Sequence, residues 1–235
     1  MRVSRLRQAG RLALLGGMAS GAAYLTYVGA TWIRYGHPGR ALRDEDDELL
    51  DRFMPIYDVV ERQHIAVDAP AAITLAEARS LSLDSIPLAR AIFRARECLL
   101  AGAPRRDDLP AGLIEQMREL GWGMLAEEPG TEIVMGAVTR PWEANPTFHA
   151  VDPAQFAQCS PPCSVKIAWT LRADPVGRDA SVFRTETRAL ATDSVARARF
   201  RTYWAFLSPG IGLIRWATLC PIKRAAEHRV AASAV

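Results

Sequence analysis

The sequence has little of several features that would assign it to a function class at once. Four cysteines in 235 residues are too few for a small disulfide-framework protein. Lysine and arginine (29) barely outnumber aspartate and glutamate (26), which is not the basic excess of a nucleic-acid-binding protein. The sequence has no glycine-rich phosphate loop, Gly-x-Ser-x-Gly elbow or His-Glu-x-x-His pair, which argues against nucleotide-binding proteins, serine hydrolases and zinc proteases. The 49% of hydrophobic and 8% of aromatic residues exclude a wholly disordered chain.

Acidic residues are absent from the first 43 positions of the chain. The same segment has seven arginines, so the positive charge belongs to the N-terminus and the rest of the chain is net acidic. These arginines are Arg2, Arg5, Arg7, Arg11, Arg34, Arg40 and Arg43.

Within this acid-free segment, Leu12 to Ile33 form a run of 22 residues without a charge. A helix of this length spans about 33 Å, enough for the hydrocarbon core of a bilayer. Trp32 beside Arg34 is typical of an interfacial anchor. We therefore predict a single-pass transmembrane helix and the lipid bilayer as a partner. A cleaved signal peptide, with small residues at Ala19–Ala23, and a buried helix of a soluble protein are the alternatives.

The flanking arginines predict the orientation of this helix. Four arginines precede the run and three follow it closely, which favours a cytoplasmic N-terminus and places the main domain outside the cytoplasm. We expect the bacterial inner membrane as the location. Gly17 and Gly21 form a small-xxx-small pair, which permits close helix–helix approach. An assembly protein that forms homo-oligomers through this pair is therefore an alternative hypothesis.

Composition divides the chain into five predicted parts. The linker contains Gly36, Pro38 and Gly39, and an acidic run at 44–48 that suits the start of a short helix over 44–53. The parts are a basic N-terminal segment (1–11), the transmembrane helix (12–33), the linker (34–55), a folded domain (56–228) and a tail (229–235).

The domain begins with an extended segment and continues with helical ones. Leu88–Leu100 places Leu88, Ala91, Ile92, Ala95 and Leu99 on one helical stripe, the pattern of an amphipathic helix. Five prolines make 140–162 irregular. The other predictions are a strand over 57–68, helices over 71–80 and 113–120, and strands over 122–127 and 132–139.

The clearest pattern is a β-hairpin. Val165, Ile167, Trp169 and Leu171 alternate with more polar residues, and a second alternating run follows at 183–189. Pairing about Gly177 places Leu171 opposite Phe183 and Trp169 opposite Thr185, with the apolar members on one face.

A long C-terminal helix is predicted from Ser194 to His228, with Asp193 as its N-cap. Pro209 and Pro221 should kink it. Its apolar stretch Tyr203–Ile222 is interrupted by Arg215, which argues against a second membrane span. Packing onto the sheet is the simpler explanation, and a role at the membrane surface is the alternative.

The segment Ile65–Ala71, the hairpin Lys166–Ala191 and the helix from Asp193 together resemble the helix-grip fold of the START-like, or SRPBCC, superfamily. This superfamily includes polyketide cyclases and plant Bet v 1-like proteins, and some bacterial members carry an N-terminal membrane helix. The resemblance covers about residues 55–228. It implies an α+β fold in which a curved antiparallel sheet wraps around the C-terminal helix, with an elongated apolar cavity between them.

From this resemblance we expect a membrane-anchored binding module for a hydrophobic or amphipathic small molecule or lipid. Each candidate wall residue could equally be ordinary core packing. The candidate ligand-binding residues are Arg140, Trp142, Val165, Ile167, Trp169, Leu171, Phe183, Tyr203, Trp204 and Leu207.

A cyclase- or dehydratase-type enzyme in the same pocket is the second hypothesis. His149 and Asp152, with Glu143 nearby, are weak candidates for an acid–base group at the pocket mouth. Cys159 and Cys163 have neither zinc nor thioredoxin spacing, and they could form a disulfide or remain free thiols. We expect no metal, no cofactor and no nucleic acid.

Overall fold

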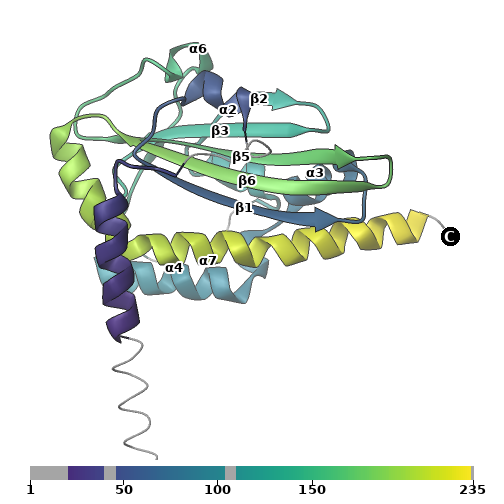
Figure 1. Cartoon of the computed structure of the whole chain (residues 1–235), viewed down its shortest axis with the longest axis horizontal. Coiled ribbons are helices and arrows are strands. Elements are labelled where there is room, and N and C mark those ends of the chain that lie inside the picture. Colours follow the sequence, from purple (N-terminus) through teal and green to yellow (C-terminus); the bar gives the residue numbers. More distant parts are fainter. Residues whose placement is uncertain (1–20, 40–45, 104–109, 234–235) are drawn as a thin grey trace, which may run out of the picture.

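The computed structural model describes residues 21–39, 46–103 and 110–233. Its centre is one six-stranded antiparallel sheet with the strand order β1-β6-β5-β3-β2, to which β4 is added beside β3 (Figure 1). The strands are β1 (Val59–Val67), β2 (Gly123–Glu128), β3 (Glu132–Thr139), β4 (Phe148–His149), β5 (Val165–Val176) and β6 (Ala180–Ala191).

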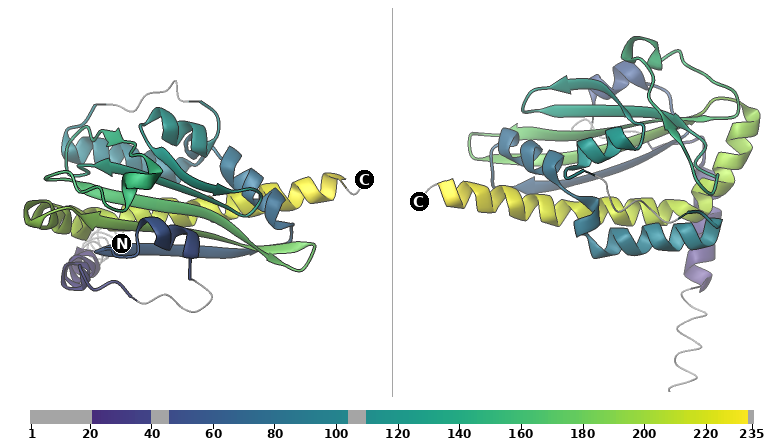
Figure 2. Two further views of the ribbon diagram at one scale, coloured as in Figure 1. Left: turned by 90° about the horizontal axis from the view of Figure 1, so that it is seen from above. Right: turned by 180° about the vertical axis from the view of Figure 1, so that it is seen from behind.

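The long C-terminal helix α7 runs along one face of this sheet, with α4 beside it (Figures 1 and 2). The short helix α2 lies on the opposite face, where Leu50 and Met54 are buried against the sheet. The architecture is therefore α+β and of the helix-grip type, as predicted. The helices are α2 (Glu48–Phe53), α3 (Ala71–Ser80), η2 (Leu83–Ser85), α4 (Pro87–Leu100), α5 (Leu113–Glu119), α6 (Pro153–Phe156) and α7 (Ser194–Ser233).

Local sequence signals explain several element boundaries. The carboxylate of Asp193 accepts a hydrogen bond from the backbone N–H of Ala196 at 2.7 Å, which caps the start of α7 as predicted. Asp47 caps α2 in the same way through the N–H of Leu50. Because α2 lies within residues 34–55, part of the predicted linker contributes to the core. Residues 229–233 of the predicted tail continue α7.

The hairpin exists, but its predicted register is wrong by two residues. Trp169 lies opposite Thr187, and Phe183 lies opposite Ala173. The reason is the turn, because Val176 pairs with Ala180 and the loop is therefore centred on residue 178 rather than on Gly177. A shift of two residues keeps every side chain on its predicted face of the sheet.

Helix α7 bends near Pro209, which lies inside it and cannot donate a backbone hydrogen bond. The N-terminal helical segment 21–34 packs against the part of α7 that precedes the bend (Figure 1). The Tyr24 hydroxyl donates to the carbonyl oxygen of Phe206 at 2.7 Å, and the Tyr27 hydroxyl lies 3.0 Å from the Ser208 hydroxyl. These tyrosines supply partners at the place where the proline weakens the helical ladder.

Among the described residues, α7 is the one helix long and apolar enough to cross a membrane by length and composition. The predicted segment Leu12 to Ile33 is described from residue 21 onward, where it is helical and exposes Leu25 and Ile33. Residues 12–20, including Gly17, lie outside the described residues, whereas nothing lies within 4 Å of a Cβ built on Gly21. The membrane span and its self-association stay predictions.

Candidate functional site

A cavity of about 590 Å³ lies between the sheet and the helices that cover it. It is bounded by β5 and β6 on one side, by α4, α5 and α7 on the other, and by the loop 144–146. This volume falls in the range of small-molecule sites in proteins. Its apolar wall consists mainly of Leu83, Phe93, Leu113, Met117, Leu120, Phe148, Trp169, Leu171, Phe183, Ile211, Ile214 and Ile222.

Three of the predicted ligand-binding residues line this cavity. Trp169 and Leu171 come from β5, and Phe183 comes from β6. They share one face because each strand alternates its side chains, and this is the face that α7 covers. The edge of the Trp169 ring contacts Trp122, with ring centroids 6.1 Å apart, so this part of the wall is held in place from outside the cavity.

The remaining predicted wall residues lie elsewhere. Val165, Ile167 and Trp204 pack with Phe200 in a separate apolar cluster. This happens because the first part of α7, before its bend, lies directly on that end of the sheet. The sequence pattern identifies the face of the sheet that α7 covers. It does not show which residues of that face pack against α7 and which line the cavity.

The other four predicted ligand-binding residues line two further grooves. Trp142, Tyr203 and Leu207 line an apolar groove of about 530 Å³ between α4, α7 and the helical segment 21–34. Arg140 lies in an open groove of about 380 Å³ at the far end of β3. A ligand-binding role for these residues stays a prediction.

The lining also includes polar side chains that the sequence pattern does not predict as site residues, namely Arg96, Glu97, Asn145, Thr185, Arg215 and Thr218. Among them, Arg215 lies on α7. Its guanidinium donates a hydrogen bond from Nη1 to the Thr185 hydroxyl at 2.6 Å. Burial lowers the pKa of Arg215 to about 10, against the opposing influence of the carboxylates of Glu61 and Glu186. No carboxylate among the described residues forms an ion pair with it. Arg215 is thus a half-buried cation in the cavity wall whose hydrogen-bond partner is a neutral hydroxyl.

A second arginine of the cavity has a structural role. Arg96 on α4 donates to the carbonyl oxygens of Pro141 at 3.3 Å and Glu143 at 3.2 Å. These bonds tie the loop after β3 to α4 and close that side of the cavity. Arg215 differs from Arg96 in that its hydrogen bond goes to a side-chain hydroxyl of the cavity wall and not to a loop backbone.

The weak catalytic candidates do not line the main cavity. His149 is exposed on β4, with its Nε2 3.1 Å from the Thr147 hydroxyl. Glu143 forms an ion pair with Arg140 at 3.6 Å, in the same open groove as His149. Asp152 caps α6 by accepting from the N–H of Ala154. These three residues form no acid–base group in the main cavity.

All four cysteines are free thiols in the structure, including Cys159 and Cys163. Cys163 adopts a left-handed backbone conformation with φ of 52°. Within residues 21–39, 46–103 and 110–233, no group of three or more His, Cys, Asp or Glu side chains is arranged to hold a metal ion.

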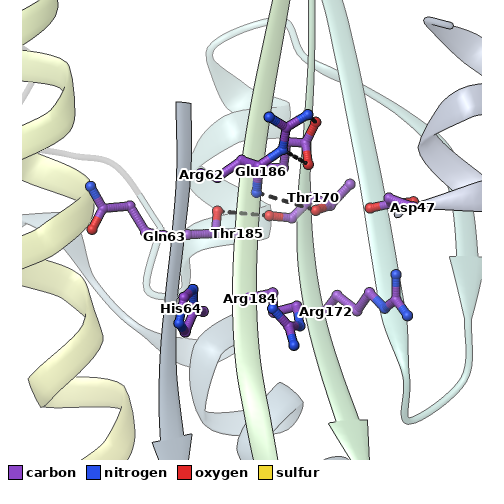
Figure 3. A pocket seen from close by; sticks show the side chains of 9 residues that line it. All are labelled: Asp47, Arg62, Gln63, His64, Thr170, Arg172, Arg184, Thr185 and Glu186. Carbon is purple, nitrogen blue, oxygen red and sulfur yellow. Dashed lines mark hydrogen bonds and ion pairs between the residues drawn. The ribbon is translucent and has the colours of Figure 1, made fainter. Parts of the chain in front are cut away.

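The outer face of the sheet has a polar network rather than a site. Arg62 on β1 holds Glu186 on β6 through two nitrogens, at 2.9 and 3.1 Å (Figure 3). Arg188 bonds the same Glu186, and also Asp51 and the carbonyl oxygen of Met54. The pocket between these side chains has only about 20 Å³, space for about one water. The network fastens α2 to the sheet.

Glu132 at the start of β3 should make the stability of the protein depend on pH. Its pKa is raised to about 9, first by burial and then by the neighbouring Asp47. The Glu132 carboxyl of the folded chain therefore keeps its proton at pH values where the unfolded chain, with a glutamate pKa of about 4.3, has released it. Stability should fall as pH rises between those two values, because the unfolded state binds fewer protons there.

We predict that Glu132→Gln stabilises the protein at pH 8, because the amide is neutral at every pH and can still donate to Asp47. The gain should grow with pH between about 4.3 and 9, because over this range the unfolded Glu132 chain loses a proton that the folded chain keeps, whereas glutamine does not titrate. Urea denaturation between pH 5 and 9 measures the gain, with Glu119→Gln, at an exposed position remote from Glu132 in the chain, as the control. An equally steep loss of stability in both variants would contradict the assignment.

Neither a protein-family model nor a curated protein sequence matches the chain. Solved structures with a similar arrangement include the di-domain ARO/CYC BexL from the BE-7585A biosynthetic pathway, at 15% identity and TM-score 0.29, over 72% of this chain and 46% of that one. The Zhui aromatase/cyclase from Streptomyces sp. R1128 is 14% identical, with TM-score 0.28, over 73% and 94% of the two chains.

DynU16, from the dynemicin biosynthetic locus, is 13% identical with TM-score 0.24, over 70% of this chain and 49% of that one. The chain thus spans about half the length of BexL and DynU16. At these identities the likeness concerns the arrangement of sheet and helices. The helix-grip architecture itself rests on the sheet order and on α7.

Proposed function

We propose that this chain is a membrane-tethered binding module whose main cavity takes an amphipathic small molecule with an apolar body and an anionic head. The observation that carries the proposal is the guanidinium of Arg215 in the wall of a mostly apolar cavity of about 590 Å³, where its hydrogen-bond partner is the uncharged Thr185 hydroxyl.

Energetics favour a ligand over an empty cavity at this position. An ionised group removed from water costs several kcal/mol unless it is paired. The Thr185 hydroxyl pairs with one nitrogen of Arg215, and it carries no charge. A carboxylate or a similar anionic group would offset the remaining cost, while its apolar chain would fill the space beside Trp169, Leu171 and Phe183.

The tether is the predicted helix from Leu12 to Ile33, and it brings the cavity close to the source of such molecules. Binding is favoured over a cyclase or dehydratase reaction because His149 and Glu143 lie outside the cavity. Arg215 and Thr185 can orient a head group without any chemical step.

The test is binding of 11-(dansylamino)undecanoic acid to the full-length protein in nanodiscs. Entry into the apolar cavity should raise the dansyl emission and shift it to the blue. Thr218→Trp fills the cavity from α7, because Thr218 is part of its lining, and we expect this variant to lose the signal.

Ala225→Trp is the matched control, since Ala225 is exposed on the same helix and outside the cavity lining. It should bind the probe like the unchanged protein. The proposal is overturned if Thr218→Trp binds as well as Ala225→Trp, or if the unchanged protein gives no more signal than empty nanodiscs.

A further inference from the structure

The apolar stripe of α4 faces outward. Its sequence predicts an amphipathic helix with Leu88, Ala91, Ile92, Ala95 and Leu99 on one side. Ile92 is half-buried next to Gly210 of α7, and the other four are exposed. Leu99 is 73% exposed. The polar Arg96 instead faces inward, towards the cavity. An amphipathic helix with its apolar side uncovered needs a partner for that side.

Helix α7 has a matching exposed stripe. On the part of α7 after its bend, Leu213, Trp216 and Cys220 follow one another at spacings of three and four residues, and all are exposed. Phe206, just before the bend, is exposed as well. Trp216 is 58% exposed. These spacings place the side chains on one face of the helix, opposite the residues that line the cavity.

The two stripes lie on the same side of the molecule. Helices α4 and α7 run side by side on one face of the sheet (Figures 1 and 2), and a Cβ on Gly210 would lie 3.0 Å from Ile92. The side of both helices that is turned away from the sheet therefore forms one surface. We call it the α4–α7 face.

The N-terminal helical segment points the same way. Its N-terminal end, in dark purple, lies beyond the layer of α4 and α7 on the side away from the sheet (Figure 1). This segment is the second half of the predicted transmembrane run from Leu12 to Ile33. A bilayer that holds this helix would therefore lie next to the α4–α7 face.

The charge of the α4–α7 face fits an anionic surface. No aspartate or glutamate occurs between Ser194 and Ala226, and α4 exposes Arg90 and Arg94. A second copy of the same face would bring arginines against arginines, which is unfavourable. Anionic lipid head groups attract such residues, each with about 1 kcal/mol near the surface. On the part of α7 after its bend, Arg224 is exposed, whereas Arg215 lies in the cavity lining and therefore does not belong to this face.

We infer that the α4–α7 face docks flat on an anionic bilayer, with its apolar stripes at the boundary between head groups and acyl chains. In this arrangement the domain lies against the membrane instead of extending into water on its tether. Two amphipathic helices lying side by side, α4 and α7, would then contact the lipid.

A fluorescent label can be attached to the native Cys220, because this residue is an exposed thiol within the α7 stripe. The experiment uses full-length protein in which the other three cysteines are serines, with a nitrobenzoxadiazole label on Cys220. The protein is placed in nanodiscs of phosphatidylcholine and phosphatidylglycerol, with or without a doxyl-labelled lipid. Docking predicts a blue-shifted emission that the doxyl lipid quenches several-fold.

The matched control carries the label on Asp179→Cys in the β5–β6 turn, with all four native cysteines replaced. Both proteins are held by the same tether, so a difference between the labels reports the face and not residence in the membrane. Charge reversal by Arg90→Glu with Arg94→Glu should reduce the quenching at Cys220. The inference is overturned if both labels are quenched equally. It is also overturned if unlabelled Cys220 forms intermolecular disulfides while its label is unquenched, which would assign the face to a second copy.

Discussion

Replacing Arg215 by methionine should lower the affinity for an anionic amphiphile by about 10- to 100-fold, because a hydrogen bond to a charged group contributes about 1.5–3 kcal/mol. Methionine keeps much of the volume of the side chain and removes its charge. The neutral alcohol of the same chain length should lose far less affinity. Competition of dodecanoate and dodecanol against the dansyl probe measures both effects.

The same substitution should leave the ligand-free protein as stable as before, or more stable. Burial lowers the pKa of Arg215, which means that the folded state destabilises its charged form. The control is Arg224→Met, an exposed position on the same helix, which should change neither binding nor stability. If Arg215→Met lost the same affinity for dodecanoate as for dodecanol, recognition of the anionic head group would be refuted. Binding of the apolar chain in the cavity is tested separately by Thr218→Trp.

The order of elements could be predicted from the sequence because local signals define it. The predicted helix over 71–80 matches α3, and the strand over 132–139 matches β3. The hairpin alternation fixes faces, since a side-chain period of two is insensitive to a slip of two residues. The register needs the turn geometry, and one glycine does not determine that.

The site was harder to predict than the order of elements. A cavity forms where side chains fail to fill the space between elements, and no residue pattern marks that place. Trp169 and Val165 have the same period and the same strand, yet one faces open space and the other faces Phe200. The bend of α7 decides between them, and its direction depends on the whole sheet. The sequence does carry a signal for Arg215, which is the single cation in the 20-residue apolar stretch 203–222. That signal argues against a membrane span without locating the side chain in a cavity.

The exposed stripe of α4 shows the converse problem. A strong 3.6-residue period identifies an amphipathic helix without saying which solvent its apolar side meets. In α4 the inward side includes Arg96, because the loop after β3 supplies carbonyl partners for it. Sequence alone has no means to foresee a core that accepts an arginine and leaves leucines outside.

The junction between the N-terminal helical segment 21–34 and the domain depends on one buried carboxylate. Asp58→Ala should therefore destabilise the protein by about 2–4 kcal/mol. The side chain of Asp58 is 4% exposed and accepts from three elements: the Tyr35 hydroxyl at 3.2 Å, the Ala191 N–H at 3.0 Å and Arg197 at 2.8 Å. Alanine would leave the first two donors buried without a partner.

The matched control is Asp174→Ala, because Asp174 also joins two arginines, Arg172 and Arg184, but is 24% exposed. Partly exposed ion pairs contribute about 1 kcal/mol or less, so this variant should lose little. Urea denaturation of both full-length variants in the same detergent compares them. If Asp58→Ala is the more damaging by the expected margin, this carboxylate is what fastens Tyr35 and Arg197 to the sheet. For a chain held in a bilayer by the proposed tether, the same contacts would then fix the orientation of the domain. Equal losses would mean that the tether is attached without fixing that orientation.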